Sequence, residues 1–151
     1  MGENGLRMDG VESMEKQKAL QINPVTLAFL GDAVYSLYVR EKLVKSGTGK
    51  VADFQRSASK VVSARGQSAF LDKLLPLLSE EETEIYRRGR NAKKPTKSKH
   101  ATVAEYTRST GFEAVLGYLY LTGQTDRINE LLSQIDEASL QGQSAEKVYK
   151  P

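Results

Sequence analysis

Two carboxylates stand in stretches of sequence that are otherwise almost entirely apolar. Asp32 interrupts FLGDAVYSLYVR (residues 29–40), where the nearest basic residue is Arg40, and Glu113 is the only charge in GFEAVLGYLYL (residues 111–121). An ionised carboxylate among hydrocarbon side chains is unfavourable unless a cation or a strong hydrogen-bond donor meets it. Two acids of this kind favour a shared site for a hard divalent cation, because Mg²⁺ is typically held by one or two carboxylates with waters completing its shell.

The same two acids also have a purely structural interpretation. Asp32 could hydrogen-bond a buried backbone group, and Glu113 could form an ion pair with Arg40 or Arg65. For one isolated acid this interpretation would be the stronger one, since structural ion pairs are common. The occurrence of two such acids, in a chain that also has a concentrated basic segment, favours the metal site.

Both acids lie in patterns that predict long helices. Asn23-Pro24 is a helix-start signal, an N-cap candidate followed by proline at the first helical position, and the pattern then runs to about Val44. Asp32 points away from the main apolar stripe of this helix, yet its flanking residues are apolar too. A helix that is apolar on both sides is buried on both, against its own core and against a partner subunit or a cleft wall. A glycine accompanies each acid (Gly31 and Gly117) and would allow another helix to approach closely.

The remaining segments also have helical periodicity. A helical region is predicted from about Val51 to Leu75, with Gly66 as a candidate break, and the capping-box pair Ser79 and Glu82 begins the next helix. Further helices are predicted over residues 101–121 and 125–140. Alternating strand patterns and internal repeats are absent from the sequence. The predicted fold class is therefore all-α, a compact helical bundle with a flexible polar lead-in at 1–19, one folded domain at 20–140 and a polar tail at 141–151.

Composition restricts the chemistry and the compartment. The chain has no cysteine and one histidine, His100, which excludes zinc sites of the usual kind and histidine-based nucleophile triads. The first residues have no apolar signal core, and no charge-free stretch is long enough to span a bilayer. These features predict a cytoplasmic protein that does not enter the membrane.

The net charge of +3 conceals a strongly basic segment, residues 87–108. This segment holds eight Lys or Arg and one acid, a net charge of +7, so the rest of the chain carries −4. Such asymmetry indicates a polyanionic partner. Charge alone leaves open whether that partner is a nucleic acid or an anionic membrane. The candidate cations, which would bind RNA if the partner is a nucleic acid, are Arg88, Arg90, Lys93, Lys94, Lys97 and Lys99 in the basic segment, with Lys60 and Arg65 outside it. A solvated loop with cations matched to a helix C-terminus explains part of the pattern, most readily for Arg87 and Arg88.

These motifs resemble a known family. FLGDAVYSLYVR is similar to the signature helix of the ribonuclease III endonuclease domain, and STGFEAVLGYLYL to its second acidic motif; VSARGQSAFL and RRGRNAK extend the resemblance over most of residues 23–135. Within that family the chain resembles the compact Mini-ribonuclease III subfamily, which lacks a double-stranded-RNA-binding domain.

The resemblance implies a homodimeric endoribonuclease of the ribonuclease III type. It would hydrolyse double-stranded RNA with Mg²⁺ (or Mn²⁺ in its place), leaving 5′-phosphate ends, and would mature the ends of large-subunit (23S) ribosomal RNA precursors; whether a ribosomal protein assists is left open. By position, Asp32 and Glu113 match the family's catalytic and metal-ligating acids.

The chain also departs from the family pattern. Family members usually have a glutamate four residues before the signature aspartate and an aspartate three residues before the late glutamate, whereas this chain has Ala28 and Thr110. We interpret this as the reduced acid set of the Mini subfamily and expect weaker metal binding or more water in the metal's shell.

Two other functions remain open at the level of sequence. A non-catalytic helical protein that binds RNA or the ribosome would use the acids structurally. A metal-dependent phosphohydrolase acting on small phosphates would use them for catalysis, but seven cations in residues 87–100 exceed what one nucleotide needs.

Overall fold

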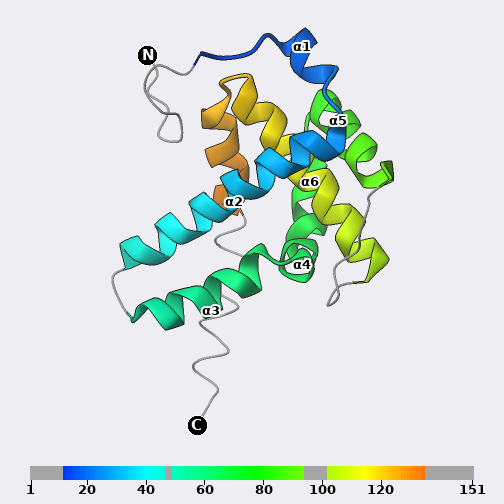
Figure 1. Ribbon diagram of the computed structural model, residues 1–151. Coiled ribbons are helices and arrows are strands. Elements are labelled where there is room, and N and C mark those ends of the chain that lie inside the picture. The colour runs from blue at the N-terminus through cyan, green and yellow to red at the C-terminus, as the bar shows by residue number, and fades with distance from the viewer. Residues whose placement is uncertain (1–11, 47–48, 94–101, 135–151) are drawn as a thin grey trace.

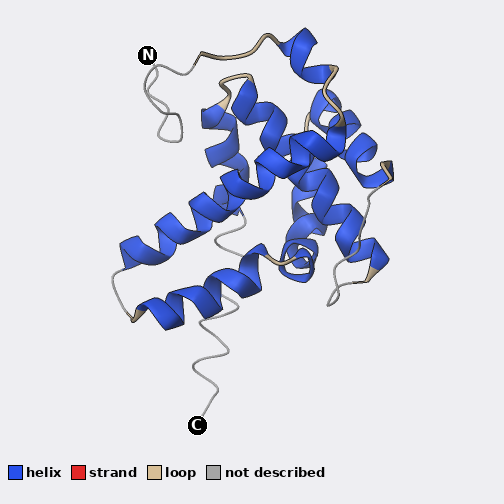
Figure 2. Cartoon of the chain, viewed as in Figure 1, coloured by secondary structure: helices blue, strands red, loops and turns tan. Residues whose placement is uncertain are grey.

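The computed structural model describes residues 12–46, 49–93 and 102–134. Every regular element in these ranges is a helix, which confirms the all-α class (Figure 2). The helices are α1 (Lys16–Leu20), α2 (Pro24–Ser46), α3 (Val51–Val62), α4 (Ala64–Leu74), the 3₁₀ turn η1 (Leu75–Leu77), α5 (Glu80–Asn91) and α6 (Val103–Leu121). Residues 125–134 form a further helical stretch, and the expected remainder of that helix lies outside the described residues.

The helix α6 lies at the centre of the fold and contacts α2, α4 and α5 (Figure 1). Its crossing with α2 is unusually close. A Cβ added at Gly31 of α2 would collide with the carbonyl oxygen of Glu113, and one added at Gly117 of α6 would collide with the carbonyl oxygen of Leu27. The two glycines that accompany the two acids in the sequence therefore bring the backbones of α2 and α6 into contact.

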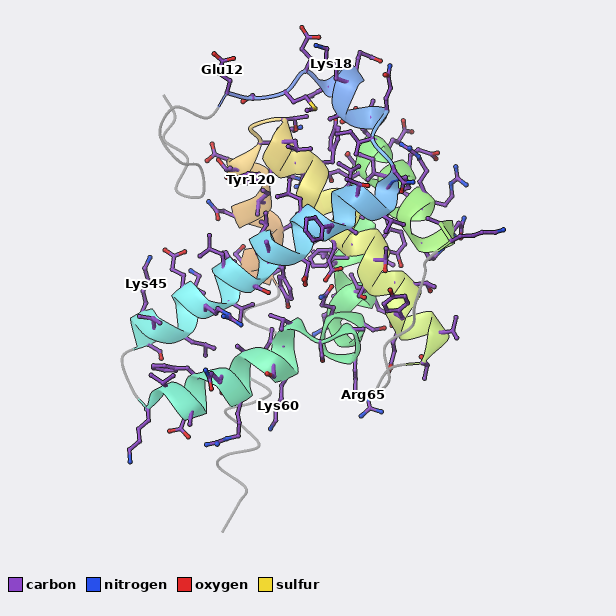
Figure 3. The ribbon with its side chains drawn as sticks, in the orientation of Figure 1. Glu12, Lys18, Lys45, Lys60, Arg65 and Tyr120 are labelled. Atoms are coloured by element: carbon purple, nitrogen blue, oxygen red, sulfur yellow. The ribbon has the colours of Figure 1, made fainter. Side chains whose placement is uncertain are left out.

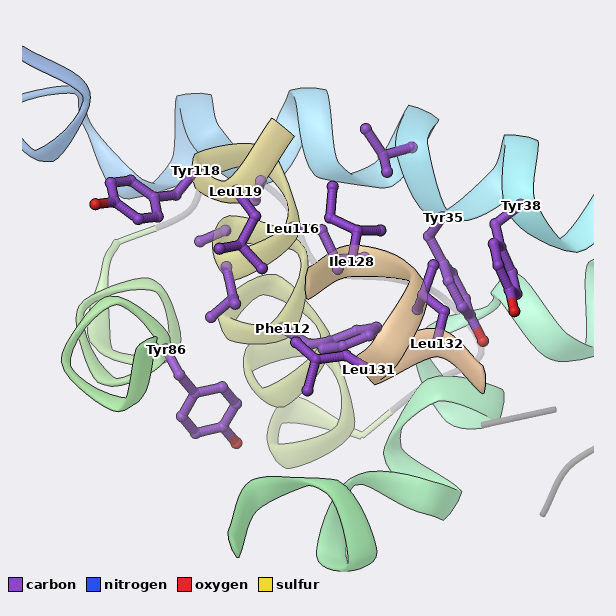
Figure 4. Packing of buried hydrophobic residues seen from close by; sticks show 14 of the residues in the cluster. Tyr35, Tyr38, Tyr86, Phe112, Leu116, Tyr118, Leu119, Ile128, Leu131 and Leu132 are labelled. Carbon is purple, nitrogen blue, oxygen red and sulfur yellow. The ribbon is translucent and has the colours of Figure 1, made fainter. Parts of the chain in front are cut away.

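The hydrophobic core fills the space between α2, α6 and the helical stretch 125–134 (Figure 4). Tyr35 of α2 and Phe112 of α6 are fully buried and meet edge to face, with ring centroids 5.7 Å apart. Ile128, Leu131 and Leu132 are also fully buried, as their predicted apolar stripe requires. Burial on this scale supplies most of the stability of the fold, at about 25 cal/mol per Å² of apolar surface.

The helical region from Val51 is divided at Ser63 and not at the expected Gly66. The Ser63 side chain caps α4 by accepting a hydrogen bond from the Gly66 backbone N–H (3.0 Å). Gly66 lies in the first turn of α4, where a Cβ would collide with the carbonyl oxygen of Lys60. The glycine thus permits a tight corner between α3 and α4, and the serine ends one helix and begins the next.

Part of the expected flexible lead-in is packed against the domain. Ala19 in α1 is fully buried, and the Met14 backbone N–H donates to the carbonyl of Leu121 (2.7 Å). The guanidinium of Arg88 donates to the carbonyl of Leu20 at 3.1 Å. The polar composition of this stretch did not indicate the packing, because one short helix with a single buried side chain has almost no periodic signal.

Among the described residues, none of the helices is both long and apolar enough to cross a membrane.

Candidate active site

Asp32 and Glu113 line the same pocket, at the crossing of α2 and α6. The pocket has a volume of about 350 Å³ and is lined by Val25, Ala28, Phe29, Asp32, Val62, Ala64, Tyr106, Ser109, Thr110 and Glu113. α2 provides one wall, α6 the opposite wall, and the α3–α4 corner the third. The close contact at Gly31 and Gly117 places the two acid-bearing helix segments side by side.

The two carboxylates have different environments. Glu113 is largely enclosed, and burial raises its pKa to about 8. A hydrogen bond from Gln67 lowers this pKa in part, whereas the neighbouring Asp32 carboxylate raises it further. The site therefore holds one acid whose charge is disfavoured unless a cation arrives.

Asp32, in contrast, is exposed, which corrects the expectation that it is surrounded by hydrocarbon. Of the apolar residues that flank Asp32 on α2, Ala28, Tyr35 and Val39 are buried, whereas the side chain of Phe29 is 83% exposed. The sequence predicted that either a partner subunit or a cleft wall lies against this side of α2. The structure shows a cleft wall around Asp32, and the partner subunit stays a prediction.

The partner of Glu113 is Gln67, which the sequence did not single out. The Gln67 amide Nε2 donates to Oε2 of Glu113 at 2.8 Å. The arginine pairings considered from the sequence do not form among the described residues: Arg65 faces Glu105 at 3.9 Å, and Arg40 lines a different pocket between α2 and α3. One signal was available, because Gln67 shares a helical face with Leu71 and Leu74 and so falls on the buried stripe of α4.

Ala28 and Thr110, which replace two acids usual in the resembled family, both lie in the pocket lining. The Thr110 hydroxyl donates to the carbonyl of Tyr106 (3.0 Å) and so remains within its own helix. In the described part of the chain, no group of three or more acidic, histidine or cysteine side chains could surround a metal ion. The donor set is two carboxylates in a solvent-open pocket, which fits Mg²⁺ with several retained waters and does not fit a closed all-protein cage.

The predicted RNA-binding cations fall into three groups. Lys60, Arg65 and Lys93 are exposed, and Figure 3 shows Lys60 and Arg65 projecting outward near the α3–α4 corner. Arg90 lies over the ring of Tyr86 at 5.7 Å, and Arg88 is half-buried in its bond to Leu20. Lys94, Lys97 and Lys99 lie outside the described residues.

Known proteins are similar to this chain over the residues that form the pocket. The family model of the ribonuclease III domain matches residues 25–124. A Mini-ribonuclease 3 from Symbiobacterium thermophilum is 46% identical over 86% of this chain and 100% of its own length, and one from Streptococcus pneumoniae is 46% identical over 74% of this chain and 89% of its own. A crystal structure of a Fusobacterium nucleatum protein superposes with a TM-score of 0.71 at 29% identity, covering 78% of this chain and 94% of that one.

The family match spans both acid-bearing helices and the α3–α4 corner, so it covers every wall of the pocket. With relatives this similar along most of its length, the chain belongs to the ribonuclease III family of endoribonucleases, alongside the proteins named Mini-ribonuclease 3.

Proposed function

We propose that this endoribonuclease hydrolyses double-stranded RNA with Mg²⁺ held by Asp32 and Glu113, and that it does so in the cytoplasm during maturation of 23S ribosomal RNA precursors. The observation that carries the proposal is the convergence of two carboxylates, from two helices, on one open pocket. Glu113 forms no ion pair with the residues that the structure describes, which removes the main alternative there; its partner among them is a neutral amide.

The chemistry of the pocket suits phosphodiester hydrolysis. Bound Mg²⁺ would supply an activated water and would offset negative charge at the phosphate. Asp32 is exposed at the pocket opening, so it is accessible to a backbone phosphate. Glu113 lies deeper, and the neutral Gln67 amide holds one of its oxygens without contributing a positive charge. Mn²⁺, another cation that accepts carboxylate ligands, is expected to substitute.

The exposed cations suit an RNA duplex. Side chains cannot read sequence in the narrow major groove of double-stranded RNA, so recognition depends mostly on shape and on the backbone. Lys60 and Arg65 flank the corner that forms one wall of the pocket. Cations at this position would hold phosphates next to the two carboxylates.

A second copy of the chain is the proposed partner on the open side of α2. Phe29 and Leu37 are large apolar side chains that are more than half exposed. Exposed apolar groups of this size on one helix are typical of a surface that another protein covers. A homodimer would bring two pockets to one duplex, one for each strand.

Substitution of Asp32 by Asn tests the proposal. We expect cleavage of a long RNA duplex to fall by about a hundredfold or more, because cation-mediated charge stabilisation contributes several kcal/mol and about 1.4 kcal/mol corresponds to a factor of ten. Folding and oligomeric state should be unchanged, since Asp32 is exposed. Glu41→Gln is the matched control: it removes a carboxylate from the same helix at an exposed ion pair with Lys45. Full cleavage by D32N would contradict the metal site, whereas a wild type that binds the duplex without cleaving it would favour a non-catalytic RNA-binding protein.

A further inference from the structure

Gln67 links three parts of the pocket wall through one side-chain amide. The residue lies in the first turns of α4 and is 1% exposed. Its Nε2 donates one hydrogen bond to the carbonyl of Val62, the last residue of α3, at 2.9 Å, and the other to Oε2 of Glu113 on α6 at 2.8 Å. Both hydrogens of the amide are therefore used, and both are used on groups that form the pocket.

The two acceptors determine the orientation of the amide. The Val62 carbonyl can only accept, so the amide nitrogen must face it, and the second N–H of the same nitrogen reaches Oε2 of Glu113. The amide oxygen is buried and receives no hydrogen bond from the residues that the structure describes. The side chain therefore donates twice while its own acceptor stays unpaired, which indicates that these two hydrogen bonds hold the amide in this orientation.

The α3–α4 corner places this amide. Ser63 caps α4 immediately after α3 ends at Val62, and Gly66 allows the first turn of α4 to lie against the carbonyl of Lys60. As a result, Gln67 begins one turn from Val62 and faces α6. The corner that lines the pocket thus also carries the donor that reaches Glu113.

A neutral donor has a specific consequence for a metal ligand. Lysine or arginine at this position would hold Glu113 but would also neutralise it and repel a cation. The amide holds one carboxylate oxygen in place and leaves the negative charge available. Hydrogen-bond donors to metal-ligating groups orient those groups, and their loss typically lowers metal affinity or activity by about 10- to 100-fold.

We propose that Gln67 is a positioning residue that orients the Glu113 carboxylate for the divalent cation. This inference rests on the proposed metal site and adds to it a residue that touches neither the cation nor the RNA. A merely structural glutamine would affect the amount of folded protein, whereas a positioning glutamine affects the affinity for the cation in protein that is fully folded.

The test measures binding of Mn²⁺ alone to the full chain by calorimetry, without RNA, for wild type and for Gln67→Leu. We expect the dissociation constant to rise about 10- to 100-fold in Q67L. The Mg²⁺ concentration for half-maximal cleavage should rise in parallel, with the rate at saturating Mg²⁺ within a few-fold of wild type. Gln55→Leu is the matched control, since it makes the same substitution at an exposed position of α3. Unchanged Mn²⁺ affinity in folded Q67L would overturn the inference.

Two further measurements separate the possible failures. If Q67L does not fold, a crystal structure of the wild type with Mn²⁺ decides: the Gln67 amide must remain in hydrogen-bond distance of the Glu113 carboxylate while that carboxylate contacts the ion, and loss of either contact overturns the inference. Asp32→Asn tests the site itself. If wild type and D32N bind Mn²⁺ equally, the proposed function fails; if D32N loses binding but Q67L retains it, only the role of Gln67 fails.

Discussion

At the scale of single residues, the surroundings of Glu113 act on its charge in opposite directions. Burial and the nearby Asp32 carboxylate favour the neutral acid, and the Gln67 amide favours the carboxylate; burial has the largest effect. The result is an acid that holds a proton near neutral pH when no cation is present. A divalent cation would displace that proton, so metal binding and pH are expected to be linked.

The first prediction concerns stability without metal. Because the pKa of Glu113 is about 8 in the folded chain and near 4.5 when unfolded, the folded state binds more protons between these pH values. Stability therefore decreases as pH rises through this window. We expect Glu113→Gln to match wild type near pH 4 and to be more stable, by on the order of a few kcal/mol, near pH 9. Urea unfolding with EDTA measures this, and a difference that does not change with pH would contradict it.

Adding Mg²⁺ provides the internal control for that experiment. The cation should stabilise wild type near pH 9, where Glu113 is ionised, because any ligand that binds only the folded state adds to its stability. It should leave E113Q nearly unchanged. Equal stabilisation of both proteins would show that the cation binds elsewhere.

A second prediction concerns Thr110, the position at which the family usually has an aspartate. Thr110→Asp adds a third carboxylate to the pocket lining, and we expect tighter Mn²⁺ binding, by about tenfold or more, because calcium- and magnesium-type sites gain affinity with ligand charge. The metal-free protein should become less stable, since the new charge lies near Glu113. Thr107→Asp, on the same helix but outside the pocket lining, is the control. Equal Mn²⁺ affinity of T110D and wild type, measured by calorimetry, would contradict this prediction.

At the scale of elements, the crossing of α2 and α6 depends on two glycines. Gly31→Ala would direct a methyl group into the carbonyl oxygen of Glu113, a backbone atom that cannot move without displacing α6. We expect a loss of about 3 kcal/mol or more, the upper range for overpacking. Ala33→Val adds volume at an exposed position of the same helix and should change stability by less than about 1 kcal/mol. Urea unfolding of both variants tests this, and a stable G31A would mean that the helices are not in close contact.

The helices themselves were largely predictable from the sequence, because caps and apolar periodicity are local signals. The start at Pro24, the capping box of Ser79 and Glu82 and the end at Leu121 are all as expected. The predicted break was misplaced at Gly66, because a glycine in a helical pattern indicates an interruption. In the structure the helix breaks at Ser63, and Gly66 instead allows a close contact that only the folded chain reveals.

The candidate site was predictable only in part. Asp32 and Glu113 could be identified because each is a charge in an apolar stretch. Gln67 could be placed on the buried stripe of α4, but its bond to Glu113 could not be predicted, because it joins residues 46 positions apart and depends on the packing of α4 against α6. The exposure of Asp32 was also unpredictable, since composition alone does not show which apolar face of α2 is left uncovered.

At the scale of the whole molecule, the cations differ in what they contact. Arg88 is committed to a backbone carbonyl that ties α5 to the end of α1, so its main effect is on packing. Lys60 is exposed, beside the corner that lines the pocket. The chain's positive charges should therefore separate into those that support the fold and those that hold a polyanion.

Salt dependence can distinguish these two classes. Each phosphate contact that is lost should reduce the slope of log affinity against log salt by about 0.7–0.9, the range for single- and double-stranded nucleic acids. We expect Lys60→Ala to reduce the slope by about this amount for an RNA duplex in EDTA, with stability unchanged. Arg88→Ala should leave the slope unchanged and lower stability by about 1–3 kcal/mol, because the Leu20 carbonyl loses its partner. The opposite pattern would place the RNA against the α1–α5 side of the molecule instead of the α3–α4 corner.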